Sequence, residues 1–86
     1  MEEGYYFYII QSQKHNRYYT GSCTDLKRRL DDHNRGNTKS TRKQGPWFLV
    51  YSETFSTLKE ARDRERQVKK WKSKNLLEKL ISDYKV

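Results

Sequence analysis

The sequence predicts an α/β (α+β) sandwich in which a three-stranded, mainly antiparallel sheet is flanked by helices, in the order β-β-α-β-α-α. Three observations lead to this fold class. Two aromatic and β-branched runs are separated by a wholly polar segment, which is typical of a hairpin. A third such run follows Pro46, and helix-capping residues precede two stretches with helical periodicity. Because the chain has only 86 residues and no linker-like segment, we expect a single domain over residues 1–86.

The predicted hairpin joins a strand at about Tyr5–Gln11 to a strand at about Arg17–Gly21. The first strand is apolar or aromatic on both of its alternating faces, so we expect it to lie at the centre of the sheet. Paired strands bring opposite side chains to roughly 5 Å from one another. Tyr8 and Tyr19 are therefore expected to lie close together.

The first helix is expected to start at a Thr24 cap and to continue to about Asn34. At about 100° per residue, three of its side chains share one face. They are Leu26, Leu30 and His33. Arg29 lies at the edge of this face and is expected to point towards the sheet, whereas Arg28 points the opposite way, into solvent.

The segment Gly36–Gly45 is a polar loop that combines positive charge with hydroxyl groups. Its basic residues are Lys39, Arg42 and Lys43, and its hydroxyl groups belong to Thr38, Ser40 and Thr41. Side chains of these types hold phosphate groups by charge and by hydrogen bonds. The same composition is equally typical of an ordinary solvated loop, so both interpretations stay open.

Apolar patterning predicts the third strand and the last helix. The strand at Trp47–Phe55 begins with a nearly continuous apolar run, which indicates burial on both faces. The helix at about Ser73–Tyr84 is expected to pack by one apolar face. The side chains on that face are Leu76, Leu77, Leu80 and Ile81.

The second helix begins with Thr57–Glu60, which fits a capping box, and is expected to end at about Trp71 or Lys72. Its inward face consists of Leu58, Ala61, Glu65, Val68 and Trp71. Glu65 is the exception, because a carboxylate midway along an apolar face must be paired, protonated or bound to a cation. Two interpretations remain: a salt bridge to an arginine at the edge of the core, such as Arg29, or a metal ligand.

The formal net charge of +8 indicates a polyanionic partner, nucleic acid before an anionic membrane surface, although a solvated basic surface is the plain alternative. No apolar run is long enough for a signal peptide or a membrane span, so we expect no membrane partner. The single cysteine, Cys23, cannot form an internal disulfide, which fits a reducing compartment. We therefore expect a cytoplasmic protein, in which Cys23 is a small residue of the strand-to-helix turn.

Several short motifs, in this order and spacing, resemble the GIY-YIG nuclease superfamily over about residues 5–75. They are Tyr6-Phe7-Tyr8, Tyr19-Thr20-Gly21, Leu26 with Arg29, His33, and Glu60-Ala61 leading to Glu65. The chain is similar to the small stand-alone bacterial members and to the nuclease domain of the excinuclease C subunit. The chain departs from the pattern in three ways. Tyr6 stands where the first motif has glycine and Thr20 is the middle residue of the second motif, Asn75 is the only candidate for a late asparagine that helps the metal site in some members, and Ser40 stands where stand-alone relatives often carry an aromatic residue.

The resemblance implies an endonuclease that hydrolyses phosphodiester bonds with a divalent cation, Mg²⁺ or Mn²⁺. By position it implies catalytic roles for Tyr8, Tyr19, Arg29, His33 and Glu65, with Glu65 as the metal ligand. These residue types suit the chemistry, because Mg²⁺ is held by few carboxylates together with phosphate oxygens and waters. An arginine clamps the same phosphate, and a phenol near positive charge activates water.

Three functions fit these features to different degrees. The first is a DNA endonuclease directed by substrate structure or by a protein partner, with a role in DNA repair or recombination. The second is a weakly catalytic or non-catalytic module that binds DNA or RNA together with a partner. The third, an interaction protein without nucleic acid, explains the motifs least well. Oligomeric state and the choice between the two tyrosines as water activator stay open.

Overall fold

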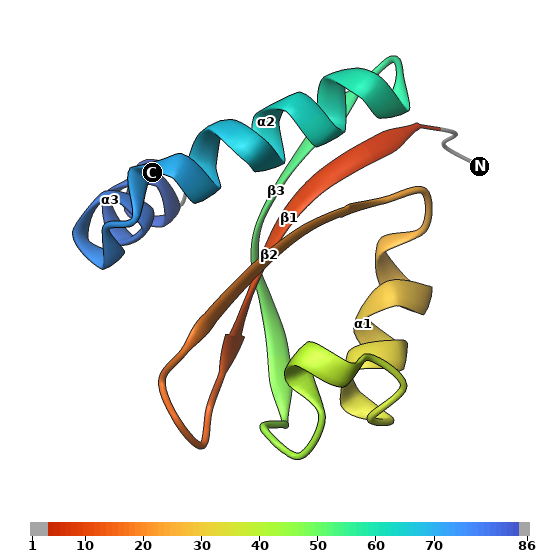
Figure 1. The fold of residues 1–86 in the computed structure, drawn as a ribbon, viewed down its shortest axis with the longest axis vertical. Coiled ribbons are helices and arrows are strands. Elements are labelled where there is room, and N and C mark those ends of the chain that lie inside the picture. Colours follow the sequence, from red (N-terminus) through yellow and green to blue (C-terminus); the bar gives the residue numbers. More distant parts are fainter. Residues whose placement is uncertain (1–3, 85–86) are drawn as a thin grey trace.

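The computed structural model describes residues 4–84, so the first three and last two residues of the predicted domain lie outside the described residues. The elements are β1 (Tyr5–Ser12), β2 (Tyr18–Cys23), α1 (Leu26–Asn34), the short 3-10 helix η1 (Lys39–Thr41), β3 (Trp47–Phe55), α2 (Leu58–Trp71) and α3 (Lys74–Tyr84). This order confirms the predicted α+β architecture (Figure 1). Both hairpin strands extend beyond their predicted ends, to Ser12 and Cys23.

The three strands are antiparallel and lie in the order β2-β1-β3, so β1 is the central strand, as predicted. Phe7, Tyr8, Ile9 and Ile10 of this strand are each at most 2% exposed, because both faces of β1 are covered. Strands β2 and β3 form the two edges of the sheet.

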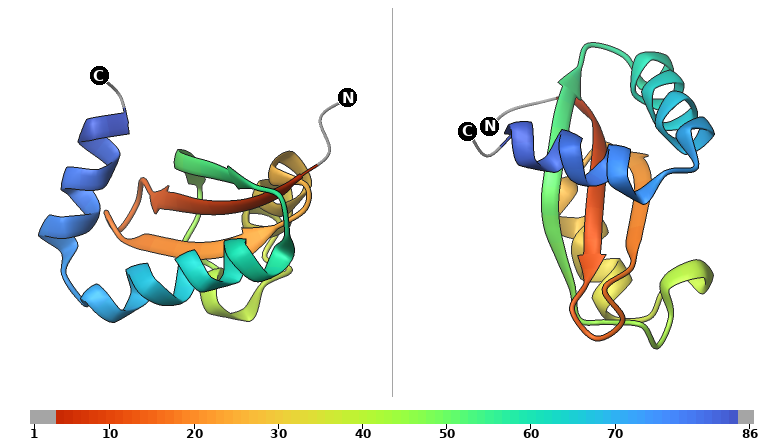
Figure 2. Two further views of the ribbon diagram at one scale, coloured as in Figure 1. Left: turned by 90° about the horizontal axis from the view of Figure 1, so that it is seen from above. Right: turned by 90° about the vertical axis from the view of Figure 1, so that its left-hand side faces the viewer.

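Helices cover the two faces of the sheet and produce two cores. On one face, Phe7 and Ile9 pack with Val68 of α2 and Ile81 of α3. The other face carries Tyr8, Ile10 and Trp47, against which the leucines of α1 pack. The right-hand view of Figure 2 shows this layering, with α3 in front of the sheet and α1 behind it.

Two predictions about burial are wrong. Phe48 and Leu49 are 51% and 41% exposed, so β3 is not buried on both faces at its start. The reason is its place at the edge of the sheet, together with an irregular register opposite Ile9 and Ile10 that leaves Val50 unpaired. Leu76, predicted to pack, is 45% exposed on the first turn of α3.

The helix ends follow local side-chain chemistry. The cap of α1 is Asp25 rather than the predicted Thr24, and its carboxylate accepts a hydrogen bond from the backbone N–H of Arg28 at 3.1 Å. The predicted capping box of α2 is present, with Thr57 and Glu60 each accepting from the other's backbone N–H. Within residues 4–84, no helix combines the length and the apolar character that a membrane span requires.

Candidate active site

Tyr8 and His33 form the buried centre of the candidate site. The Tyr8 hydroxyl oxygen lies 2.9 Å from His33 Nε2, and His33 Nδ1 lies 2.8 Å from the Thr41 hydroxyl oxygen. Tyr8 comes from β1, His33 from the last turn of α1 and Thr41 from η1. Each of the three residues is at most 2% exposed. A continuous polar chain therefore crosses the apolar layer between the sheet and the 36–45 loop.

Burial sets the charge state of this chain. It lowers the pKa of His33 from 6.5 to about 4, with a smaller contribution from the nearby Arg29 cation. It also raises the pKa of the Tyr8 phenol from 10 to about 12, although Arg29 opposes that shift. At neutral pH both groups are therefore uncharged, so His33 has one donor nitrogen and one acceptor nitrogen.

The ring of Tyr8 fits here because β2 presents a glycine directly opposite it. Gly21 is the register partner of Tyr8. A Cβ atom at Gly21 would lie 2.5 Å from the Tyr8 hydroxyl oxygen and 2.7 Å from its Cζ atom. Non-bonded carbon atoms settle at roughly 3.5–4.0 Å. Any side chain at position 21 would therefore displace Tyr8 from His33.

Asn34 and Trp47 hold the loop that carries Thr41. The Asn34 side chain accepts a hydrogen bond from the Trp47 backbone N–H at 2.6 Å and donates to the Trp47 carbonyl at 3.1 Å. The Trp47 indole N–H then donates to the Thr41 carbonyl at 3.2 Å. These three bonds tie the end of α1, the start of β3 and η1 together, so the Thr41 hydroxyl is held against His33.

Tyr19 lies beside this centre, as the sequence predicts. Its ring centroid is 4.9 Å from that of His33 and 6.5 Å from that of Trp47. Its register partner is Ile10, so Tyr19 is the diagonal neighbour of Tyr8 on the same face of the sheet. The Tyr19 hydroxyl makes no hydrogen bond with any described residue and its side chain is half-buried, so it is free to bind water or a ligand.

Arg29 reaches the centre from α1, whereas Arg28 is exposed, as predicted for both. The proximity of the Arg29 guanidinium to the Tyr8 hydroxyl is the largest cause that raises the pKa of Arg29. Its ion pair with Asp32 is long, at 3.9 Å, and the Arg29 side chain is 37% exposed. The guanidinium therefore lies near Tyr8 and keeps donors that a phosphate group can use.

Glu65 lies on α2, and its carboxylate is engaged by two neighbours. Ser22 of β2 donates a hydrogen bond to it at 2.8 Å, and Lys69 Nζ lies 2.6 Å from its other oxygen. The side chain is 21% exposed. The salt bridge to Arg29 that was one interpretation of the sequence is therefore wrong, because a lysine one turn away on the same helix pairs with Glu65 instead.

The surroundings of Glu65 fit only a metal ion that keeps most of its own water. Within residues 4–84, no group of three or more histidine, cysteine or acidic side chains is placed to hold a metal. Mg²⁺ is commonly held by one or two carboxylates together with waters and substrate phosphates. The Glu65 carboxylate, with the Ser22 hydroxyl beside it, matches that donor set once Lys69 moves off the carboxylate.

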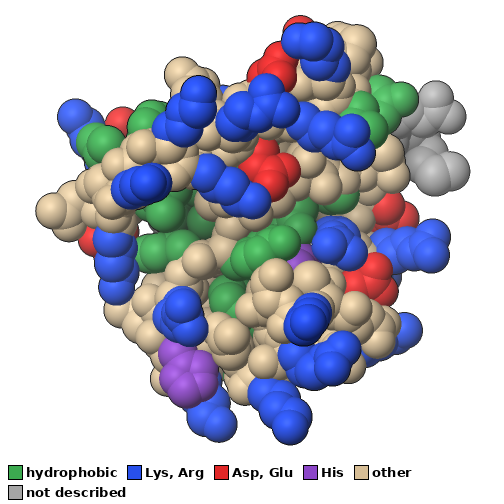
Figure 3. Space-filling model, in the orientation of Figure 1, with side chains coloured by type: hydrophobic (Ala, Val, Ile, Leu, Met, Phe, Trp, Pro, Cys, Tyr) green, Lys and Arg blue, Asp and Glu red, His purple; other side chains and the backbone are tan. Residues whose placement is uncertain are grey.

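The predicted residues approach the open edge of β2 from both faces of the sheet. Tyr8, Tyr19, Arg29 and His33 lie on the α1 side, and Glu65 lies on the α2 side. Glu65 and Arg29 line two adjoining hollows, and Ser22 and Arg62 belong to both. On the face seen in Figure 3, Lys and Arg side chains gather along α2 around an acidic group. Of the predicted catalytic residues, Arg29 and Glu65 line these hollows, so a phosphate at this edge would meet these two directly.

The 36–45 loop differs in part from its predicted role. Lys39, Arg42 and Lys43 are exposed, although the Arg42 Nε donates to the Gly36 carbonyl at 3.1 Å. Thr41 does not face solvent, since its hydroxyl is turned onto His33. Phosphate binding by the three cations stays a prediction.

Three residues that the sequence analysis did not place in the site belong to its geometry. Ser22 and Lys69 contact Glu65, and Thr41 contacts His33. Only Lys69 carried a signal, because its spacing of four from Glu65 is that of a helical ion pair. The other two contacts join segments that are far apart in the chain or separated by a loop.

Comparison with known proteins shows the family of the chain. The family model described as "GIY-YIG catalytic domain" matches residues 4–79. A UPF0213 protein of Staphylococcus saprophyticus is 39% identical over 80 residues, covering 92% of this chain and 95% of that protein. The YazA protein of Bacillus subtilis, also a UPF0213 protein, is 37% identical over 71 residues, covering 81% and 72%.

A solved structure is similar as well. The solution NMR structure of the UPF0213 protein BH0048 from Bacillus halodurans matches with a TM-score of 0.58 and 36% identity. The match covers 92% of this chain and 83% of that chain. The chain belongs to the GIY-YIG catalytic domain family.

Proposed function

We propose that this protein is a divalent-metal-dependent endonuclease that hydrolyses DNA phosphodiester bonds at the open edge of β2. The observation that carries the proposal is the approach of two different sets of groups to one edge. Arg29, whose guanidinium lies near the buried Tyr8–His33 pair and Tyr19, lines one hollow beside Ser22 from the α1 side, and Glu65 lines the adjoining hollow from the α2 side. Hydrolysis of a phosphodiester needs a clamp for the phosphate, a route for a proton and charge stabilisation, and this set contains all three.

Mg²⁺ or Mn²⁺ is the cofactor in this proposal, and Glu65 is its protein ligand. When bound, the cation stabilises negative charge on the phosphoryl oxygens and on the leaving group. The Arg29 guanidinium then holds the same phosphate by charge-assisted hydrogen bonds. Lys69 gives up its contact with Glu65 and becomes available to a phosphate oxygen.

The proton of the attacking water leaves through Tyr8 and His33 in our proposal. If His33 Nδ1–H donates to Thr41, then Nε2 accepts the proton of the Tyr8 hydroxyl, 2.9 Å away. With the pKa of Tyr8 near 12 and that of His33 near 4, neither a free phenolate nor an imidazolium is stable at pH 7. The proton therefore moves through the pair only in concert with attack on the phosphate, with Tyr19 positioning the water.

A second candidate function is a nucleic-acid-binding module that cuts weakly or not at all and works with a partner protein. One observation favours it: Lys69 already neutralises Glu65, in a hollow that basic side chains surround. These side chains are Arg62, Arg66, Lys69, Lys70 and Lys72. We rank it below the nuclease because the buried Tyr8–His33–Thr41 chain is more than phosphate binding requires.

The proposal also includes the cellular compartment and the way the cleavage site is chosen. Cys23 has no disulfide partner among the described residues, and it packs against the Tyr8 core, which suits a reducing cytoplasm. We propose that a structured DNA or a protein partner selects the cleavage site, in repair or recombination. A domain of this size has little surface with which to read bases in a groove.

Cleavage of supercoiled plasmid and of branched DNA, with Mg²⁺ and with Mn²⁺, tests the nuclease. We expect Glu65→Gln and Arg29→Ala each to reduce the rate by about 10²-fold or more. Asp63→Asn is the matched control, because it removes an exposed carboxylate from the same helix without touching β2. Full activity of Glu65→Gln in highly purified protein contradicts the proposal. Folded wild-type protein that binds DNA but never cuts it supports the second candidate.

A further inference from the structure

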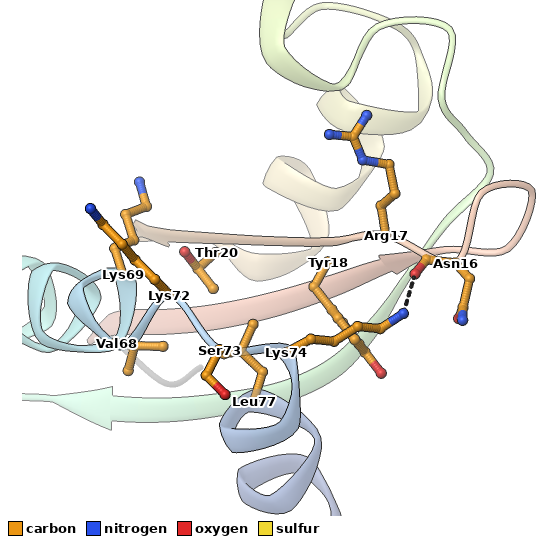
Figure 4. A pocket seen from close by; sticks show the side chains of 10 residues that line it. All are labelled: Asn16, Arg17, Tyr18, Thr20, Val68, Lys69, Lys72, Ser73, Lys74 and Leu77. Atoms are coloured by element: carbon orange, nitrogen blue, oxygen red, sulfur yellow. Dashed lines mark hydrogen bonds between the residues drawn. The ribbon is translucent and has the colours of Figure 1, made fainter.

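A cavity of about 370 Å³ lies next to the candidate active site, between β2, the end of α2 and the start of α3 (Figure 4). Figure 4 shows the lining side chains on these elements and on the β1–β2 turn. They belong to Asn16, Arg17, Tyr18, Thr20, Val68, Lys69, Lys72, Ser73, Lys74 and Leu77. None of the residues used in the proposed proton relay borders this cavity, so it calls for an explanation of its own.

The lining combines an apolar floor with a basic rim. Tyr18, Val68 and Leu77 supply apolar surface, and Tyr18 is held in place by a hydrogen bond from its hydroxyl to Glu78 at 3.3 Å. The rim carries four cations and no acidic side chain. These cations belong to Arg17, Lys69, Lys72 and Lys74. A ligand that suits both parts is flat and apolar at one end and anionic at the other.

We propose that this cavity seats one unpaired nucleotide of the DNA strand that is cut. The inference rests on the proposed nuclease function and names its substrate more closely. The base lies against Tyr18 and Leu77, and the phosphate lies among the lysines of the rim. Stacking of bases on aromatic side chains beside a basic groove is how proteins hold single strands without reading sequence.

Continuity with the Glu65 hollow supports this assignment. Lys69 and Lys72 line both the cavity and the hollow that contains Glu65. A strand whose phosphate lies near Glu65 therefore finds the cavity next to it along the same row of cations. The cavity volume is at the small end of the range for ligand sites, roughly 300–1,000 Å³, which suits a single nucleotide. A base pair needs more room, so the strand must be unpaired at this point.

Lys74 is the residue best placed to respond to a phosphate. Its ammonium lies 5.8 Å from the centre of the Tyr18 ring and 3.4 Å from the Asn16 carbonyl, a long hydrogen bond that Figure 4 shows as a dashed line. Because this bond is weak and the side chain is exposed, a phosphate group can replace the carbonyl at little cost.

The test is an NMR titration of ¹⁵N-labelled Glu65→Gln protein without metal, so that binding is seen without cleavage. The probes are deoxyadenosine 5′-monophosphate, inorganic phosphate, a short single-stranded oligodeoxynucleotide and a blunt duplex of the same sequence. We expect the monophosphate and the single strand to shift the amide signals of Tyr18, Thr20 and Leu77. We expect the single strand to bind about tenfold more tightly than the duplex.

Two variants and one control sharpen the test. Tyr18→Leu keeps apolar bulk but removes stacking, and should weaken binding of the single strand about tenfold. Lys74→Gln should weaken it several-fold and lower its salt dependence. Lys79→Gln makes the same change of charge at an exposed position of α3 outside the cavity and should leave binding unchanged.

Three results would overturn the inference. They are the absence of shifts at the cavity, equal responses to inorganic phosphate and to the monophosphate, and duplex binding as tight as single-strand binding. None of these depends on cleavage, so the two proposals can fail separately. Glu65-dependent cutting with an unresponsive cavity removes the nucleotide site alone. A responsive cavity in a protein that never cuts DNA removes the nuclease and leaves a single-strand-binding site.

Discussion

The Tyr8 hydroxyl and the His33 imidazole meet at 2.9 Å in a part of the core where neither residue is more than 2% exposed. Polar groups with so little exposed surface must largely satisfy one another. Among the described residues, every buried side-chain nitrogen and oxygen has a hydrogen-bond partner. The chain from Tyr8 through His33 to Thr41 is thus structural as well as a proposed proton route, and removing one member leaves another unsatisfied.

Thr41→Val tests the outer end of this chain. The substitution keeps the shape of the side chain but leaves His33 Nδ1 without its partner at 2.8 Å. We expect the free energy of unfolding to fall by about 1–3 kcal/mol, measured by urea denaturation. Ser40→Ala, at the exposed neighbouring position of η1, is the control and should change stability by less than about 0.5 kcal/mol. Equal effects of the two substitutions would show that the Thr41 hydroxyl contributes nothing.

His33 should make stability depend on pH. Its pKa is about 4 in the folded protein and about 6.5 in the unfolded chain, so the unfolded chain binds the extra proton first. The contribution of neutral His33 is therefore complete above pH 6.5 and is lost as the pH falls from 6.5 towards 4. The shift corresponds to about 3 kcal/mol. Urea denaturation of wild type and His33→Gln at pH 7.5 and pH 4 measures it.

The comparison of these two proteins isolates the histidine from the carboxylates that titrate in the same range. We expect His33→Gln to lose about 3 kcal/mol less than wild type on acidification. His15→Gln, in the exposed β1–β2 turn, should lose as much as wild type. Parallel pH profiles for wild type and His33→Gln would mean that burial does not hold His33 neutral.

Local patterns in the sequence were enough to predict most of the fold. The apolar residues on both faces of β1 indicated a central strand, and Thr57 with Glu60 indicated the start of α2. Phe48 and Leu49 misled the prediction, because an apolar run reads alike in a central strand and in an edge strand. Edge position depends on strand order, which is a property of the whole chain rather than of any segment.

The sequence indicated which residues of the candidate site lie near one another, but only some of the contacts that they make. Tyr8, Arg29 and His33 were placed near one another by hairpin and helix geometry, and the structure brings them together. The partner of Glu65 was not Arg29, since the nearest cation in space is the one four residues along α2. The Ser22 contact joins residues 43 apart in the chain, and no local pattern reports such a pairing.

Gly21→Ala tests the close approach of β2 to Tyr8. Its Cβ would lie 2.5 Å from the Tyr8 hydroxyl oxygen, so either the ring or the strand must move. We expect a loss of about 1–3 kcal/mol in unfolding free energy, which thermal or urea denaturation measures. The same substitution made in a Tyr8→Leu background should cost at least about 1 kcal/mol less, because the ring is no longer there. An equal cost in both backgrounds would place the strain in the backbone of β2.

Lys69→Gln tests whether Lys69 competes with a metal ion for the Glu65 carboxylate. Lys69 Nζ lies 2.6 Å from Glu65, where it competes with any metal ion that uses the same carboxylate. The lysine side chain is 52% exposed, and such pairs contribute up to about 1 kcal/mol. Its removal should therefore tighten Mn²⁺ binding by about two- to fivefold in the absence of DNA, measured by electron paramagnetic resonance of free Mn²⁺.

Lys70→Gln is the matched control for this competition. It removes the same charge from the next position of α2, where the lysine lines the Glu65 hollow but makes no ion pair with a described residue. A general effect of lower positive charge would tighten Mn²⁺ binding equally in both variants. Direct competition for the carboxylate tightens it in Lys69→Gln alone, and Glu65→Gln then abolishes the difference between the two. If Mn²⁺ binding persists unchanged in Glu65→Gln, the metal ion does not use this carboxylate.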